Sequence, residues 1–139
     1  MMKTVNVAAA VIEKDRKILA TQRGYGDFKG GWEFPGGKIE PGETPEAALI
    51  REIREELRAD ITIEKFLTTV EYDYENFHLS MKCYLCHLKS NTFVLTEHLG
   101  SRWLDKNELD EVAWLPADIE VLNLIKEEIE VNCSTSEEA

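Results

Sequence analysis

Long hydrophobic runs are absent from this sequence of 139 residues, and without about 18 consecutive apolar residues no membrane-spanning helix is expected. The N-terminal stretch from Met1 to Val5 also lacks the apolar segment and the small-residue cleavage site of a secretory signal peptide. Cysteine is scarce, with three residues, which is too few and an odd number for a disulfide framework. These absences together predict a protein of the reducing cytoplasm with no membrane partner.

Two of the three cysteines, Cys83 and Cys86, have the CxxC spacing that occurs in metal and redox sites. They lie in an alternating stretch from Leu79 to Cys86, and this alternation predicts a β-strand. Residues three apart on a strand point to opposite faces, so the two sulfur atoms are not expected to meet. We therefore predict that both cysteines are structural, with one buried and one facing outward.

Positive charge is also in short supply, because 16 Lys and Arg residues face 27 Asp and Glu residues and the net charge is −11. This balance argues against binding to polymeric nucleic acid, which needs a positive surface. It does not exclude a small anionic ligand, because a bound cation can supply the missing charge. A protein of this composition that handles phosphates is expected to recruit a metal ion.

The chain contains 43% hydrophobic residues, enough for a core, and it has no internal repeat or linker. We expect one domain over residues 1–132 and a frayed polar tail over residues 133–139. The order of predicted elements is strands, helix, strands, helix. This order predicts an α/β (α+β) fold in which a mixed β-sheet is sandwiched between helices. The sequence does not distinguish a monomer from a homodimer.

Apolar alternation and turn residues locate the predicted strands. They are a hairpin of Val5–Ile12 and Ile18–Arg23, a short extended piece at Trp32–Phe34, two long strands at Ile61–Tyr74 and His78–Leu88, and one more at either Phe93–Leu95 or Arg102–Leu104. The segment from Gly24 to Gly31 contains four glycines and is expected to be a mobile loop.

Two helices are predicted, and the first begins with Thr44 as N-cap and Pro45 at the first helical position. Its apolar stripe consists of Ile50, Ile53 and Leu57. The second helix is expected from Ile119 to Val131, with a stripe of Ile119, Leu122, Ile125 and Ile129. Between them, Asp105 and Glu108 have the spacing of a capping box and predict a short helical turn.

Three glutamates of the first helix carry the strongest chemical signal. Glu52 and Glu56 are four residues apart and stack on one face at about 5–6 Å between Cβ atoms, with Glu55 beside them. Carboxylates this close together repel one another, and Arg51 offsets part of the repulsion through its i,i+4 position to Glu55. A solvated charged face and a Mg²⁺ site are both compatible with this helix alone.

The segment before the helix favours the metal site. The Gly36-Gly37 turn allows the main chain to approach a ligand, and Glu43 follows a tight Pro41-Gly42 turn. Gly37, five residues, Glu43, seven residues and then Arg51-Glu52-Ile53-Arg54-Glu55-Glu56 resemble the Nudix box of the MutT-type hydrolases. The flanking stretch from Trp32 to Lys38 is similar to that of nucleotide-cleaning members, and the resemblance spans Val5 to about Glu128.

One position departs from the family pattern, because Arg58 stands where members usually have a glycine. A glycine there would act as a left-handed helix cap. Arginine in that conformation costs roughly 1 kcal/mol, unless the helix ends in a different way.

The resemblance implies Mg²⁺-dependent hydrolysis, with Mn²⁺ as an alternative ion, of a nucleoside triphosphate to the monophosphate and pyrophosphate. The implied metal ligands are the Gly36 carbonyl and the carboxylates of Glu52, Glu55 and Glu56. Glu52 also resembles the residue that activates water in the family. Glu97, from a loop before Trp103, would be a further ligand or base, and an ordinary surface glutamate is an equal alternative.

The resemblance also implies supporting roles for residues around this site. Arg51 would orient the carboxylates with Glu43 as its partner. Arg23 and Lys38 resemble residues that contact phosphate, although Lys38 is equally explained as a solvated lysine beside a turn.

Asp118, within Trp114–Ile119, resembles the position at which MutT-type enzymes contact the base. An ionised carboxylate only accepts hydrogen bonds, which favours the adjacent N1–H and 2-amino donors of guanine or its 8-oxo form. The same stretch also resembles relatives that prefer CTP-type substrates, and Asp118 could instead cap the last helix. Phe77 and Trp114 could stack on a base, the alternative being a place in the core.

Other activities stay open. Hydrolases of ADP-ribose and of dinucleoside polyphosphates share the box, and Tyr72 and Tyr74 keep the dinucleoside substrate in consideration. A nucleotide-binding module that has lost catalysis is the remaining hypothesis. Arg58 alone supports that hypothesis, because every acidic residue of the box is present.

Overall fold

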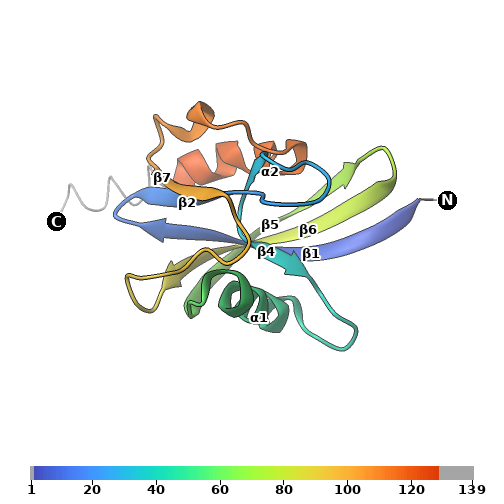
Figure 1. Cartoon of the computed structure of the whole chain (residues 1–139), viewed down its shortest axis with the longest axis horizontal. Coiled ribbons are helices and arrows are strands. Elements are labelled where there is room, and N and C mark those ends of the chain that lie inside the picture. Colours follow the sequence, from blue (N-terminus) through green and yellow to red (C-terminus); the bar gives the residue numbers. More distant parts are fainter. Residues whose placement is uncertain (1, 129–139) are drawn as a thin grey trace.

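The structure, a computed structural model, describes residues 2–128 as a mixed β-sheet with helices on both faces (Figure 1). The fold is therefore the predicted α+β arrangement. In chain order the elements are β1 (Lys3–Lys14), β2 (Lys17–Gln22), β3 (Trp32–Glu33), β4 (Gly36–Lys38), α1 (Pro45–Leu57), β5 (Ile61–Asp73), β6 (Phe77–Leu88), β7 (Gly100–Leu104), the 3₁₀ turn η1 (Leu109–Glu111) and α2 (Pro116–Ile119).

Strand β1 lies at the centre of the sheet, whose order is β3-β2-β1-β6-β5. It runs parallel to β6 from the Lys3–Phe77 pair to the Ile12–Cys86 pair, and it is antiparallel to β4 and β2. The predicted hairpin of the first two strands is confirmed. The last strand is β7, which pairs with β2, so the alternative strand at residues 93–95 is wrong.

Helix α1 begins and ends largely as the sequence predicts. The Thr44 hydroxyl caps it by accepting a hydrogen bond from Ala47 N at 3.1 Å, with Pro45 at its first position. Its end is set by Arg58, which has left-handed φ and ψ angles of 49° and 43° and donates its N–H to Arg54 O at 3.0 Å. Arginine therefore forms the cap that usually needs glycine, and the helix keeps its length at the cost of local strain.

Two hydrophobic clusters lie on the two faces of the sheet. One, which includes Leu49, Ile53 and Leu57, packs under α1, and the other packs under the C-terminal helical segment. Cys83 belongs to the second cluster and Cys86 to the first, so the prediction of opposite faces is confirmed. The prediction of an outward cysteine is wrong, because helices cover both faces and bury both side chains. Burial raises the pKa of each thiol to about 12, which keeps both unreactive at neutral pH.

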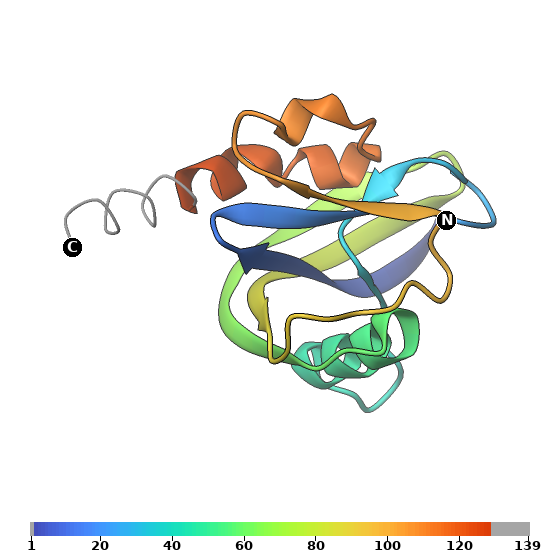
Figure 2. The same ribbon diagram turned by 60° about the vertical axis from the view of Figure 1, so that its left-hand side comes forward.

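The C-terminal helix differs from its prediction. Helix α2 covers Pro116–Ile119, a turn follows, and residues 122–128 are helical again on the side of the sheet opposite α1 (Figure 2). The interruption shifts the buried face, so that Ile119 is 53% exposed and its predicted place in the apolar stripe is wrong. Leu122 and Ile125 are buried as predicted, and Val121 is buried as well. Ile129, Val131 and the tail lie outside the described residues.

The capping box is confirmed, since Asp105 N donates to Glu108 Oε1 at 2.9 Å and Glu108 N donates to Asp105 Oδ1 at 3.1 Å, just before η1. Within residues 2–128, no helix combines the length and apolar character that crossing a bilayer requires.

Candidate active site

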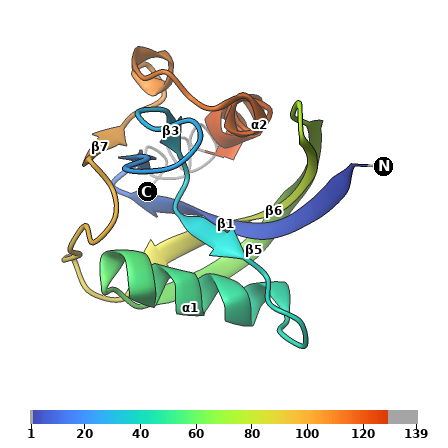
Figure 3. The same cartoon turned by 45° about the vertical axis from the view of Figure 1, so that its right-hand side comes forward.

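A cleft of about 600 Å³ crosses the molecule beside β4. It is lined by residues of β1, β4 and β6, by the glutamates of α1, by the loop after β2 and by Asp118 of α2. Because α1 and α2 lie on opposite faces of the sheet (Figure 3), the cleft reaches from one helical layer to the other. A ligand of nucleotide size can therefore contact both layers at once.

The three glutamates of α1 face this cleft in different environments. Glu55 is solvated, with its side chain 59% exposed. Burial raises the pKa of Glu52, and burial together with the charge of Glu52 raises the pKa of Glu56 to about 8. The predicted crowding of carboxylates is thus present, and Glu56 holds a proton at neutral pH when no cation is nearby.

The two glycines of β4 allow its main chain to lie directly against these carboxylates. A Cβ atom on Gly37 would come within 2.4 Å of the Glu52 carboxylate, and one on Gly36 would come within 2.1 Å of Ala8 O. Gly36 N donates to Glu56 Oε2 at 3.2 Å. Any larger residue at position 37 would push Glu52 out of its place.

Arg51 joins the helix to the preceding loop. Its Nε and Nη2 atoms donate to the two oxygens of Glu43 at 2.8 and 2.9 Å, and the predicted contact is confirmed. Its Nη1 donates to Glu52 Oε1 at 2.8 Å and to Glu55 Oε2 at 3.4 Å. The hydrogen bonds from Arg51 lower the pKa of Glu43 to about 2. Arg51 and Glu43 do not line the cleft, so they act by holding Glu52 and the loop.

Asp118 is buried at the α2 side of the cleft, with 5% of its surface exposed. Its Oδ1 atom accepts a hydrogen bond from Phe34 N at 3.1 Å, and burial raises its pKa to about 8. The cap position of α2 is Leu115 and makes no side-chain hydrogen bond, so the alternative that Asp118 caps this helix is wrong. A pKa near 8 favours the protonated carboxyl group at neutral pH, whereas the sequence predicts an ionised carboxylate.

Comparison with known protein families matches residues 2–131 to the NUDIX domain. The chain is a Nudix hydrolase. It is 35% identical over 122 residues to the CTP pyrophosphohydrolase of Escherichia coli, with coverage of 87% of this chain and 90% of that protein. It is 42% identical over 101 residues to the 8-oxo-dGTP diphosphatase of Proteus vulgaris, with coverage of 71% and 88%.

Solved structures agree with this assignment. The solution structure of a MutT protein of the Nudix family from methicillin-resistant Staphylococcus aureus superposes with a TM-score of 0.75 at 42% identity and covers 92% of this chain and 99% of that one. This Nudix hydrolase is thus of the MutT type and acts on nucleotide phosphoanhydrides.

Nudix hydrolases generally need a divalent metal, usually Mg²⁺. Among residues 2–128 no three Asp, Glu, His or Cys side chains already converge into a complete metal site. Mg²⁺ does not require one, because it commonly keeps several waters and takes one or two carboxylates together with substrate phosphates. The carboxylates of Glu52 and Glu56, packed against the Gly36-Gly37 main chain, are a donor set that fits this mode of binding.

The remaining predicted residues of this Nudix hydrolase fall into two groups. Arg23, Lys38, Phe77 and Glu97 all line the cleft. Trp114 does not, because it is buried against Phe34 with ring centroids 4.6 Å apart and its Nε1 donates to Leu109 O at 2.6 Å. Trp114 therefore belongs to the core, which was the alternative to a stacking role.

Three cleft residues were missed from the sequence. Glu33 pairs with Arg23, whose Nη2 atom lies 2.6 Å from Glu33 Oε1. His98 has a side chain only 3% exposed and lies 3.9 Å from Glu33 Oε2. The Tyr25 hydroxyl donates to Glu97 Oε2 at 3.3 Å. Glu33 lies in the 32–38 stretch that resembles nucleotide-cleaning members, but no motif marks the contacts among these residues. They meet only through the pairing of β2 with β3 and the path of the loop before β7.

Proposed function

We propose that this chain is a Mg²⁺-dependent pyrophosphohydrolase that converts a nucleoside triphosphate to the monophosphate and pyrophosphate and so clears unwanted triphosphates from the nucleotide pool. The observation that carries the proposal is a single cleft that joins the glutamates of α1, packed on the β4 glycines, to the buried Asp118. Similarity to a CTP pyrophosphohydrolase and to an 8-oxo-dGTP diphosphatase supports it.

The proposed chemistry follows from the acidic side of the cleft. Gly36, Glu55, Glu56 and Glu97 are the proposed metal ligands with Glu52, and the bound ion would neutralise phosphate charge and lower the pKa of the attacking water. Arg51 holds Glu52 in place, and Glu52 would accept the proton of the attacking water. The water oxygen forms the new bond to phosphorus. The phosphoanhydride bond breaks and pyrophosphate leaves. Arg23 and Lys38 are the proposed contacts to the phosphates.

Asp118 is the proposed contact to the base. As a neutral acid it offers one O–H donor and one acceptor, which match the O6 and N1–H groups of guanine or 8-oxoguanine. The same pair also matches N3 and the 4-amino group of cytosine, whereas the ionised form matches only guanine-type bases. Because guanine-type bases match both states of Asp118 and cytosine matches only the neutral acid, we propose 8-oxo-dGTP or dGTP as the preferred substrate. The E. coli relative makes CTP the second candidate. Phe77 is the proposed stacking surface, since it lines the cleft.

A substrate screen tests the assignment. Pyrophosphate release is measured with 8-oxo-dGTP, dGTP, CTP and dCTP, and cleavage of ADP-ribose and of a diadenosine polyphosphate is followed in parallel. The expected result is the fastest turnover with a guanine-type triphosphate in the presence of Mg²⁺. Binding of a non-hydrolysable nucleotide without turnover of any substrate would instead favour the non-catalytic module.

Substitutions of the cleft glutamates, compared with a control on the same helix, test the proposed catalytic roles. Glu52→Gln and Glu56→Gln are each expected to lower kcat by about 10²–10⁴-fold while the protein stays folded, because the first removes the proposed general base and the second removes a proposed metal ligand. Glu46→Gln is the control, since Glu46 lies in the first turn of the same helix and does not line the cleft. Full activity of both cleft variants would show that the site lies elsewhere.

A further inference from the structure

The loop between β6 and β7 is fastened to the C-terminal end of α1. The last carbonyls of a helix have no partner within the helix itself. Here Val94 N donates to Leu57 O at 2.8 Å, and Thr96 N donates to Glu56 O at 3.0 Å. The Thr96 hydroxyl lies 3.0 Å from Glu55 O and 2.9 Å from Glu56 O, between which it shares its one proton. The loop is thus bound to the very turn that carries two of the cleft carboxylates.

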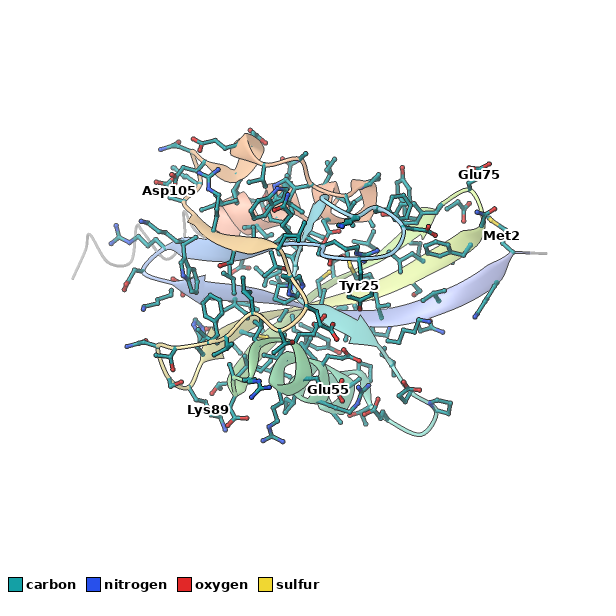
Figure 4. The ribbon with its side chains drawn as sticks, in the orientation of Figure 1. Met2, Tyr25, Glu55, Glu75, Lys89 and Asp105 are labelled. Atoms are coloured by element: carbon teal, nitrogen blue, oxygen red, sulfur yellow. The ribbon has the colours of Figure 1, made fainter. Side chains whose placement is uncertain are left out.

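Glu97 is placed over the cleft by these contacts. It follows Thr96 directly, so its Cα lies one peptide unit, about 3.8 Å, from a residue that is fixed to α1. On its other side the main chain of Gly24 approaches so closely that a Cβ there would come within 2.1 Å of Glu97 O. Its carboxylate reaches the Tyr25 hydroxyl, and Tyr25 faces the same cleft as Glu55 (Figure 4).

We propose that Thr96 is a positioning residue for Glu97: by bonding to the carbonyls of Glu55 and Glu56, it fixes the distance from the loop carboxylate to those of α1. Thr96 does not line the cleft, so it acts through Glu97 and not on the substrate. The inference rests on the proposed function, in which Glu97 binds metal or accepts a proton.

Thr96→Val tests the role of the hydroxyl, because valine keeps the shape of the side chain and removes the donor. We expect kcat to fall about tenfold through a small displacement of Glu97, with KM changed less than about twofold. Thr96→Ser restores the donor and should restore most of kcat. The matched control is Thr92→Val, in the same loop. The Thr92 side chain makes no hydrogen bond to residues 2–128 and should be replaceable without loss.

A double-mutant cycle with Glu97→Gln tests whether the loss of kcat in Thr96→Val arises through Glu97. If Thr96 acts through Glu97, Thr96→Val causes no further loss of kcat in the Glu97→Gln background. Mn²⁺ binding without nucleotide, followed by electron paramagnetic resonance of the free ion, is the second readout and should show the same non-additivity if Glu97 is a ligand. Non-additivity in either measurement supports the proposal.

Two results would overturn it. One is an equal loss from Thr96→Val with and without Glu97 in both measurements, and the other is full activity of Glu97→Gln. Full activity of Glu97→Gln would also remove Glu97 from the proposed metal ligands. Neither result touches the proposed reaction itself, which fails separately if Glu52→Gln and Glu56→Gln remain active.

Discussion

Asp118 is the residue whose surroundings most change its chemistry. An aspartate on a surface is ionised at neutral pH, but burial beside Phe34 keeps this one protonated up to about pH 8. It thereby gains a donor that the ionised form lacks. The consequence is a residue that can pair with guanine or cytosine at neutral pH and with guanine alone at higher pH.

The protonated state of Asp118 predicts how stability varies with pH. In the unfolded chain the carboxyl releases its proton near pH 4, whereas in the folded chain it does so near pH 8. The folded state binds more protons between these values, so its contribution to the free energy of unfolding falls as pH rises through this window. Urea unfolding at pH 5 and pH 8 should therefore show a smaller decrease for Asp118→Asn than for the unsubstituted protein. Equal decreases in both proteins would contradict the assigned protonation state.

Substrate preference should change with pH for the same reason. As pH rises from 7 to 9, the ratio of kcat/KM for 8-oxo-dGTP to that for CTP is expected to increase, because the ionised carboxylate no longer donates to cytosine N3. The Asp118→Asn variant keeps a donor and an acceptor at every pH, because a side-chain amide does not titrate in this range. The ratio for this variant should stay flat, and a rise equal to that of the unsubstituted protein would assign the titration to another group.

At the scale of elements, the C-terminal end of α1 combines a strained residue with external support. Arg58 adopts the left-handed conformation that glycine occupies without cost, and the loop before β7 provides partners for the preceding carbonyls. The helix therefore ends where the family pattern requires, although the usual residue is missing. The intrinsic preference of arginine opposes the left-handed conformation at position 58, and the contacts with the loop before β7 outweigh that preference.

Arg58→Gly is expected to raise the free energy of unfolding by about 1 kcal/mol, because it relieves the strain of the left-handed cap. Catalytic activity should stay the same, since Arg58 does not line the cleft. Urea unfolding measures the first effect and pyrophosphate release the second. Arg58→Ala is the control, because alanine also has a Cβ atom and should bring no comparable gain in stability.

The two helices also show what local sequence can predict. Helix α1 carries its own start signal in Thr44 and Pro45 and a regular apolar stripe, so its bounds follow from nearby residues. The second helix is interrupted after Ile119, where Asp118 and Val121 are buried together with the predicted Leu122 and Ile125. A buried aspartate cannot be recognised from hydrophobic periodicity, which assigns it to the surface.

At the scale of the whole molecule, the sequence and the family resemblance locate the α1 glutamates of the box and also Arg23, Lys38, Phe77 and Asp118 at the cleft, but they do not predict the contacts between distant segments. The spacing of Glu43, Arg51 and Glu52 is contained in one segment of chain, and their contacts agree with the prediction. Glu33 and His98 come from distant segments that meet only in the folded sheet. A single sequence carries no signal for such encounters.

The net charge of −11 and the glutamates that line the cleft repel a triphosphate, so we expect a bound cation to assist its entry. Removal of divalent ions with EDTA is expected to abolish pyrophosphate release, and added Mg²⁺ or Mn²⁺ should restore it. Mg²⁺ should also raise Tm in the presence of a non-hydrolysable nucleotide, because ligands that bind only the folded state stabilise it. Turnover that persists in EDTA would contradict a metal-dependent mechanism.

The short run of main chain from Phe34 to Gly37 touches both helical layers. At one end the amide of Phe34 is held by Asp118, and at the other the backbone of Gly36 and Gly37 supports Glu56 and Glu52. The residues proposed for base recognition and for hydrolysis thus contact one stretch of main chain three peptide bonds long. An ill-fitting base that disturbs the first end should slow hydrolysis at the second, so the enzyme would distinguish nucleotides by their turnover as well as by their affinity.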